Sequence, residues 1–219
     1  MKQIYIFGVN GNAQDVAEAI CLIRLRDPGF PPLSGFLDDR IAKGSKINGV
    51  PVCGMIRSAR KLRDAYFVNA IGSPESYLLK PAIISRANIS DSKFISIVHP
   101  NATISSSARL GRGSVVLSNT SIGSCVKIGN HVMILQNCVI SHGTQVENYS
   151  VMATGVCLGG NVHIKKGAYL GSQSCIRTGL KIGQHALVGM GSVVLKNVPA
   201  SEIWCGNPAH YLRPVSFHI

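Results

Sequence analysis

One histidine stands in a stretch that otherwise has the pattern of a β-strand. His142 lies in the segment VISHGTQVENYS, residues 139–150, where small and aliphatic residues alternate and no turn signature surrounds the histidine. An imidazole can accept a proton at neutral pH, so His142 is a candidate general base. A purely structural histidine is the alternative, and the fold that places the residue decides between them.

A second set of candidates, for binding a ligand, lies in the first hundred residues, where apolar runs end. Gly8-Val9-Asn10-Gly11 is a glycine turn, and Asp38-Asp39 and Gly72 each follow an apolar run. In a parallel α/β sheet these points converge beyond the carboxyl ends of the strands, where ligands bind. The turn lacks the third glycine of a dinucleotide fingerprint, which disfavours NAD. Alternatively, the two glycines only form the turn, and Asp38 and Asp39 only cap the backbone where their strand ends.

Residues 102–197 consist of sixteen six-residue units without an insertion. The third position of every unit is aliphatic, the first is small or aliphatic, and glycine is frequent at the fourth and sixth. A helix cannot keep a period of six on one face, whereas a β-solenoid can if each unit is one side of a triangular coil. Three units make one coil, so the repeat predicts about five coils spaced ~4.8 Å apart.

In such a solenoid residues 18 apart stack, and the second position of each unit points outward. The sequence therefore predicts three outward columns. The first is polar and consists of Arg109, Lys127, Gln145, His163 and Lys181. The second is polar at first and apolar later, with Thr103, Ser121, Val139, Cys157, Cys175 and Val193, and the third is entirely apolar, with Val115, Met133, Val151, Tyr169 and Leu187. Exposed apolar columns on a rigid prism require a partner.

The remaining histidines and the cysteines fit structural roles. His131, His163 and His185 fall at other repeat positions than His142, and we expect them to be structural. The seven cysteines form no CxxC pair, which is typical of reduced thiols in a cytoplasmic protein. The stacked Cys157 and Cys175 are expected to be core or interface thiols, and no metal is predicted.

The first hundred residues alternate strand and helix signals. A buried-strand run, residues 4–7, precedes the glycine turn and an amphipathic helix, and PPLSGFLDD and AYFVNAIGS predict two further strands. A second helix is expected after Gly72, through about Ser85. This alternation predicts a small parallel α/β, Rossmann-like domain over residues 1–97. Residues 98–219 then form the β-helix with a C-terminal tail.

The formal net charge is +12. Nucleic acid, a small polyanionic ligand and plain solubility are all compatible with it. The basic residues are scattered along the chain, and no aromatic-basic run suggests a base-stacking platform, so no nucleic-acid partner is predicted. No apolar run approaches the ~20 residues of a membrane helix, and the first one is too short for a signal peptide. We therefore expect a cytoplasmic protein without a membrane span.

Together the two halves closely resemble one family, the bacterial nucleotide-sugar acetyltransferases of the NeuD and PglD type. The resemblance covers IYIFGVNGNAQDVAEAI, GFLDD, FVNAIGS, SIVHPNATIS, the repeat and the closing WCGNPAHYL, with Gly206-x-Pro208-Ala209 a common end mark of such transferases. It implies a left-handed β-helix and a homotrimer, whose three prisms would bury the apolar columns. It also implies transfer of the acetyl group of acetyl-CoA to an amino sugar on a UDP or dTDP carrier, or to a sialic acid hydroxyl in the NeuD branch.

The resemblance also implies roles for single residues. His142 matches the catalytic histidine, and Gly160, one coil on, matches the glycine whose N–H faces the thioester carbonyl. Ser172 and Met190 match positions that contact CoA. The residues expected to bind the nucleotide sugar are Asn10, Gly11, Asn12, Asp38, Asp39 and Gly72.

Three residues depart from the family pattern. Gly143 replaces the acid that usually follows the catalytic histidine, so a backbone carbonyl, Ser141 or a neighbouring chain must orient His142. Val151 stands where some relatives have a CoA-contacting histidine, and Asn12 replaces a histidine. We predict an acetyl-CoA-dependent N-acetyltransferase acting on a nucleotide-linked amino sugar. The alternatives are O-acetylation of sialic acid or another surface-polysaccharide sugar, and a catalytically degenerate scaffold.

Overall fold

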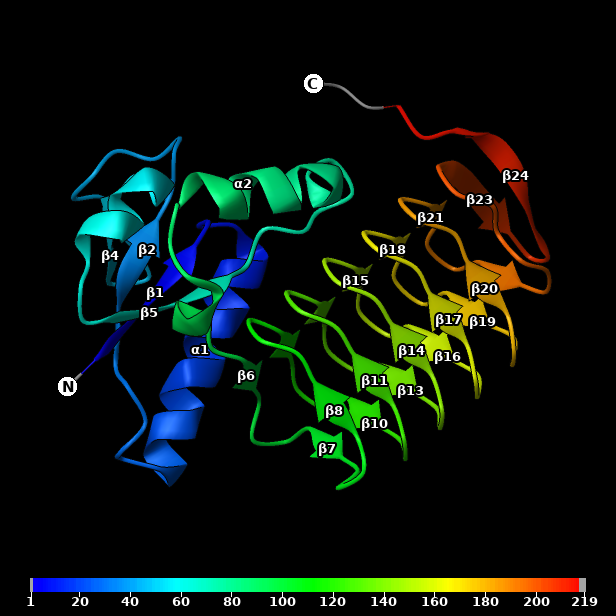
Figure 1. The fold of residues 1–219 in the computed structure, drawn as a ribbon, viewed down its shortest axis with the longest axis horizontal. Coiled ribbons are helices and arrows are strands. Elements are labelled where there is room, and N and C mark those ends of the chain that lie inside the picture. Colours follow the sequence, from blue (N-terminus) through cyan, green and yellow to red (C-terminus); the bar gives the residue numbers. More distant parts are fainter. Residues whose placement is uncertain (1, 217–219) are drawn as a thin grey trace.

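A five-stranded sheet forms the N-terminal half (Figure 1). In the computed structural model, which describes residues 2–216, β1 (Gln3–Phe7) lies between β2 (Leu33–Leu37) and β5 (Ala65–Asn69), and all three are parallel. Helix α1 (Gly11–Arg26) connects β1 to β2 and begins where the Ala13 N–H donates to the Asn10 side chain (3.1 Å). The predicted α/β half is therefore confirmed.

Some elements of this half differ from the sequence prediction. The sheet continues beyond β2 with β4 (Val50–Gly54), which pairs with the two-residue β3 (Lys46–Ile47) as an antiparallel hairpin that the sequence did not indicate. The second helix, α2 (Lys80–Arg86), begins later than expected because the 3-10 turn η2 (Tyr77–Leu79) precedes it. Two further 3-10 turns are η1 (Ile56–Lys61) and η3 (Asp91–Lys93).

The second half is the predicted β-helix, and its short parallel strands stack into three faces. The covered face begins with β6 (Ile97–Val98) and continues through β9 (Val115–Val116), β12 (Met133–Ile134), β15 (Val151–Met152), β18 (Tyr169–Leu170) and β21 (Leu187–Val188). The cysteine face comprises β7 (Thr103–Ile104), β10 (Ser121–Ile122), β13 (Val139–Ile140), β16 (Cys157–Leu158), β19 (Cys175–Ile176) and β22 (Val193–Val194). The lysine face comprises β8 (Arg109–Leu110), β11 (Lys127–Ile128), β14 (Gln145–Val146), β17 (His163–Ile164) and β20 (Lys181–Ile182).

Strand pairing follows the 18-residue coil without a slip. Cys157 pairs with Cys175, and His163 pairs with Lys181, each in register with its neighbour. The third positions of the units fill the interior as one core cluster, in which only the first coil leaves Ile104 and Leu110 partly exposed. Aliphatic side chains at this position therefore hold the coils together from inside.

The corners of the coil explain the frequent glycine at the sixth position. Every sixth position from 113 to 191 has a positive φ, and eight of these fourteen residues are not glycine. The sharp turn into the next strand requires this left-handed conformation, which glycine adopts without a Cβ penalty and which asparagine and histidine tolerate better than branched residues. His131 and His185 occupy such corners.

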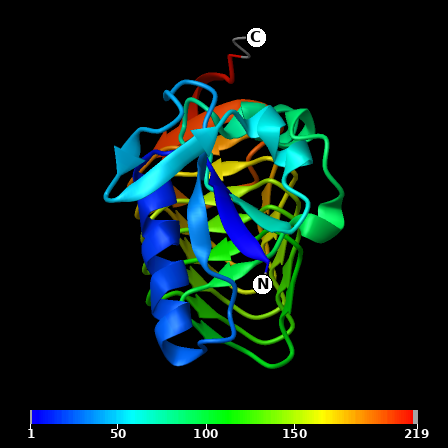
Figure 2. The same cartoon turned by 90° about the vertical axis from the view of Figure 1, so that its left-hand side faces the viewer.

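The N-terminal half packs along the covered face, with α1 running beside the stacked coils (Figure 2). The apolar column of this face, including Met133, Val151 and Tyr169, joins the same buried cluster as Ile6 and Ile20. The expectation that a trimer buries this column is therefore wrong. The protein's own N-terminal half covers it, because α1 and the loop after β5 reach across the coils.

Polar contacts complete this boundary between the halves. The Tyr77 hydroxyl donates to the His185 carbonyl (3.0 Å), and the Gln136 amide donates to Asp15 (2.9 Å). β6 already belongs to the covered face, so the domain boundary expected after residue 97 falls inside this strand. The coil ends in a hairpin of β23 (Glu202–Gly206) and β24 (Ala209–Pro214), and residues 217–219 of the expected C-terminal tail lie outside the described residues.

Candidate functional site

His142 lies in the turn after β13, at the edge where the cysteine face meets the lysine face. The residue is exposed, and its carbonyl accepts a hydrogen bond from the Asn161 N–H of the next coil (2.8 Å). The N–H of the following Gly143 donates to Ser124 of the preceding coil (2.9 Å). Hydrogen bonds to both neighbouring coils therefore hold the backbone that carries the imidazole, while the residue stays open to solvent.

Gly160 lies under the imidazole, as the 18-residue spacing predicts. A Cβ at this position would stand 2.6 Å from Cε1 and 2.7 Å from Nε2 of His142. Atoms do not approach so closely, so a side chain at residue 160 would push the ring away. The imidazole can lie against residue 160 only because that residue has no side chain.

The structure explains why no acid follows His142. Gly143 has a φ of +68°, and a Cβ there would lie 2.1 Å from Oδ1 of Asn161. The Asn161 side chain thus occupies the space that a carboxylate at residue 143 would need. Sequence reasoning overlooked Asn161, although its spacing of 18 residues from Gly143 was a usable signal.

Ser172 and Met190 lie at a different edge of the coil. They sit in the turns after β18 and β21, where the covered face meets the cysteine face. The two residues stack, since the Gly191 N–H donates to the Ser172 carbonyl (2.8 Å), and Met190 is 78% exposed. Within one chain the width of the cysteine face therefore separates them from His142 and Gly160.

A cavity of about 580 Å³ opens at the carboxyl ends of β1, β2 and β5. Three of the residues predicted to bind the sugar carrier line it: Asn10, Asp38 and Asp39. Two arginines that the sequence did not single out, Arg40 and Arg86, line it as well. Arg86 comes from α2, far along the chain from the glycine turn, so no local motif pointed to it.

The two aspartates already have backbone partners. Asp38 is buried, and its Oδ1 accepts from the N–H groups of Arg40 (2.8 Å) and Ile41 (3.2 Å). Asp39 is exposed, and its Oδ1 accepts from the Ile56 N–H (2.9 Å) at the start of η1. Each carboxylate thus stabilises a turn through one oxygen and has a second oxygen available for a ligand.

The other three predicted sugar-carrier residues do not line this cavity. Asn12 points toward the coil, with its amide nitrogen 3.6 Å from the sulfur of Met133. Gly72 faces the coil too, because a Cβ there would meet Val151 at 3.1 Å. Gly11 is exposed at the start of α1. In the structure, Asn12 and Gly72 contribute to packing between the halves.

A buried polar pair lies between the halves, near α2. Lys80 is 1% exposed, and burial lowers its pKa to about 7. The ring of His131 stacks on Tyr149 and meets Phe94 edge-on. Burial, and then the positive charge of Lys80, lower the pKa of His131 to about 4. A neutral histidine among aromatic rings fits the structural role expected for His131.

Residues 2–216 contain no group of three or more His, Cys, Asp or Glu side chains arranged to hold a metal ion. Over the same residues, no helix is long and apolar enough to cross a membrane.

The chain thus has an α/β half followed by a hexad-based β-helix, which carries an exposed corner histidine over a glycine. The profile "Hexapeptide repeat of succinyl-transferase" matches residues 161–196. A search of curated protein sequences finds no match.

Solved structures match almost the whole chain. PerB from Caulobacter crescentus, in complex with CoA and GDP-perosamine, is 27% identical, with a TM-score of 0.81 over 97% of this chain and 98% of that chain. WeeI from Acinetobacter baumannii AYE is 27% identical, with a TM-score of 0.82 over 97% and 100%. The acetyltransferase domain of PglB from Neisseria gonorrhoeae FA1090, in complex with acetyl coenzyme A, is 24% identical and shares the fold, with a TM-score of 0.84 over 96% and 99%.

The resemblance to sugar acetyltransferases of the NeuD and PglD type is thereby confirmed. The protein is an acetyltransferase whose coil contains a hexapeptide repeat.

Proposed function

We propose that the protein transfers the acetyl group of acetyl-CoA to the amino group of a nucleotide-linked amino sugar. The similarity to PerB, whose structure holds CoA and GDP-perosamine, supports both the donor and the class of acceptor. The arrangement of His142 over Gly160 carries the proposal, because it presents a base beside a backbone cleared of side chains.

His142 acts as the general base in this reaction. The acceptor nitrogen attacks the thioester carbonyl and loses a proton to the imidazole of His142, which is exposed to solvent. The new C–N bond forms as the C–S bond breaks, and the CoA thiolate leaves and takes up a proton. The Gly160 N–H, in the corresponding turn of the next coil, stabilises the oxyanion.

The cavity of the N-terminal half holds the nucleotide part of the acceptor. Arg40 and Arg86 supply positive charge for the diphosphate, and the free oxygens of Asp38 and Asp39 accept hydrogen bonds from base or sugar. The carboxylates face a ligand that also carries negative charge, so they are suited to its donor groups and not to its phosphates.

A homotrimer completes the site. The N-terminal half packs on the covered face, whereas His142 lies at the edge where the other two faces meet, so one chain does not bring acceptor and base together. Val139 is 44% exposed on the cysteine face, and Cys157 and Cys175 are exposed beside it. We assign this face to the contact between copies, with Ser172 and Met190 of one copy near His142 of the next.

The seven cysteines are all free thiols, which supports a cytoplasmic location.

One observation favours a second candidate, O-acetylation of a sialic acid or another surface-polysaccharide sugar. Asp38 and Asp39 each already stabilise a backbone turn, so their presence does not require a nucleotide ligand.

Release of the free CoA thiol separates the two candidates. The purified protein is given acetyl-CoA with UDP-, dTDP- or GDP-linked amino sugars, or with free sialic acid. Turnover that depends on the nucleotide-linked amine supports the proposal. Turnover with the free sugar alone makes O-acetylation the function, and acetyl-CoA binding without turnover on any sugar overturns both.

A further inference from the structure

The coil gathers its basic residues on one face, a pattern that is not visible in the linear sequence. Residues 102–197 contain eight Lys or Arg, and six of them lie on the strands of the lysine face or in the turns that follow these strands: Arg109, Arg112, Lys127, Lys165, Lys166 and Lys181. Only Arg177 and Lys196 lie elsewhere. In the N-terminal half, by contrast, basic and acidic residues are mixed.

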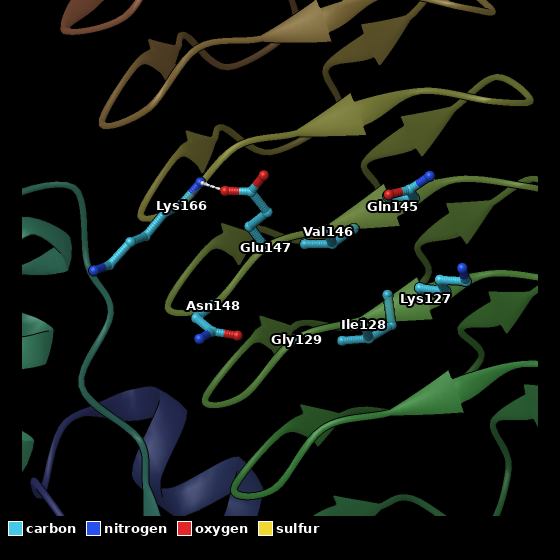
Figure 3. A pocket seen from close by; sticks show the side chains of 8 residues that line it. All are labelled: Lys127, Ile128, Gly129, Gln145, Val146, Glu147, Asn148 and Lys166. Atoms are coloured by element: carbon cyan, nitrogen blue, oxygen red, sulfur yellow. Dashed lines mark hydrogen bonds between the residues drawn. The ribbon is translucent and has the colours of Figure 1, made fainter.

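The same stretch has one acid, Glu147, and the face itself neutralises it. Its Oε1 accepts from the Lys165 ammonium and lies 3.0 Å from Nε2 of His163. Its Oε2 accepts from the Lys166 backbone N–H (3.0 Å), as Figure 3 shows. One carboxylate thus offsets one lysine.

Five basic side chains of the face remain free of an ion pair with any of residues 2–216, and all five are exposed: Arg109, Arg112, Lys127, Lys166 and Lys181. Because the strands pair in register, the outward column rises in steps of ~4.8 Å and spans roughly 20 Å over five strands. Backbone hydrogen bonds to adjacent coils hold this spacing, so the charged side chains start from regularly spaced positions on the face.

We propose that the lysine face docks the protein onto a membrane surface rich in anionic phospholipids. Charge complementarity carries the proposal, since clustered Lys and Arg side chains are attracted to anionic headgroups near a bilayer. None of the large hydrophobic side chains that the described residues expose is on the strands of this face, so the contact is peripheral and reversible. The proposal is independent of the sugar specificity of the enzyme.

Single-stranded nucleic acid fits the face less well. The outward column contains no Phe, Tyr or Trp side chain on which a base could stack, and its one histidine, His163, is held by the Glu147 carboxylate (3.0 Å). Tyr149, at the edge of the face, is already stacked on His131 with ring centroids 5.4 Å apart. Headgroups need no such platform and move laterally to match a fixed array of charges.

Vesicle co-sedimentation of the full chain tests the proposal. The vesicles are pure phosphatidylcholine, or phosphatidylcholine with phosphatidylglycerol in about a 3:2 ratio. Wild-type protein should bind only the anionic vesicles, and binding should weaken as salt rises from ~50 to ~300 mM. The double variant Lys127→Glu/Lys181→Glu should lose at least about tenfold in affinity while keeping its transferase activity.

A matched control has the same change in net charge at another place. Lys43→Glu/Lys46→Glu alters two exposed lysines of the N-terminal half and should bind anionic vesicles within about twofold of wild type. An equal loss of vesicle affinity in both double variants would show that binding depends only on net charge, and it would overturn the assignment to this face. Absence of wild-type binding, or tighter face-dependent binding to single-stranded DNA than to the vesicles, would also overturn it.

Discussion

The imidazole of His142 and the backbone of Gly160 are in direct contact across two successive coils, with no room between them for a methyl group. This contact depends on an unbroken run of six-residue units, since one inserted residue would rotate the histidine away from the glycine.

The first prediction removes the base. His142→Ala should lower kcat by roughly 10²–10⁴, the usual loss with a general base, and leave acetyl-CoA affinity near wild type. Steady-state kinetics and isothermal titration with CoA measure the two effects. His163→Ala is the matched control, because that ring contacts Glu147 on the lysine face, and it should stay close to wild-type activity. Retention of more than about a tenth of wild-type kcat would exclude His142 as the base.

The second prediction fills the space under the ring. Gly160→Ala introduces a Cβ at 2.7 Å from Nε2, so the exposed imidazole must swing away. A displacement of the base by about 1 Å lowers kcat about 10²-fold, and the melting temperature should hardly change because the ring moves into solvent. Kinetics and thermal denaturation of the same preparation check both. Unchanged kcat would show that the stacked orientation of His142 is not the reactive one.

The third prediction concerns the covered face. Tyr169 is 8% exposed and packs against Tyr77, with ring centroids 5.5 Å apart. Tyr169→Asp should lower the free energy of unfolding by on the order of 3–5 kcal/mol, because it removes a buried aromatic ring and buries a carboxylate. Urea denaturation followed by circular dichroism measures this loss.

Val139→Asp is the partner experiment to Tyr169→Asp. Val139 is on the cysteine face and 44% exposed within one chain, so the variant should dissociate the assembly without unfolding the protomer. Light scattering gives the mass in solution. If Tyr169→Asp separates the assembly into protomers that stay folded, and Val139→Asp leaves the assembly intact, the contacts assigned to the two faces are reversed.

The fourth prediction separates charge from capping at the cavity. Asp39→Asn keeps an Oδ1 that can accept from the Ile56 N–H, but it removes the negative charge. We expect the KM for the sugar substrate to rise several-fold and the KM for acetyl-CoA to stay unchanged, because the sites proposed for the two substrates lie in different parts of the chain. A rise in both KM values would indicate a general structural defect. A rise in neither would show that Asp39 only caps the start of η1 and does not bind the sugar substrate.

The fifth prediction concerns Lys80, whose ammonium nitrogen has no hydrogen-bond partner in residues 2–216. Its pKa is about 7 in the folded protein, against 10.5 as the usual value. Between these values the unfolded chain binds more protons than the folded one, so stability rises with pH across this window and is lost as pH falls toward 7. Lys80→Met should therefore raise the melting temperature most near pH 6, with the gain shrinking toward pH 10.

The exposed Lys46→Met serves as the control for Lys80→Met and should show no such pH dependence. A difference between Lys80→Met and wild type that stays constant over this pH range would contradict the titration of Lys80.

The repeat made the coil predictable, down to the stacking of single residues. The position of Gly160 under His142 and of Met190 beside Ser172 follows from a spacing of 18, because each aliphatic third position fixes the register of its unit. The short hairpin of β3 and β4 was missed, since the two residues of β3 are too few for any periodic signal.

What the sequence could not show is which outward residues meet the other half of the chain. The column containing Tyr169 is apolar whether a second copy or the chain's own α1 covers it, and hydrophobicity alone does not distinguish these partners. Asn12 and Gly72 were predicted to bind the sugar carrier because they lie where strands end, the region in which ligands of parallel α/β sheets bind. Their neighbours, Met133 and Val151, come from distant coils, and local motifs carry no information about such contacts.

The packing at Gly72 limits how proteins of this architecture can diverge. A Cβ at Gly72 would stand only 3.1 Å from Val151, so a transplanted acceptor domain would fit this coil only if both surfaces changed together. New acceptor specificity should therefore arise by substitution around the cavity, at residues such as Arg40 and Arg86, while the domain itself is inherited with its coil.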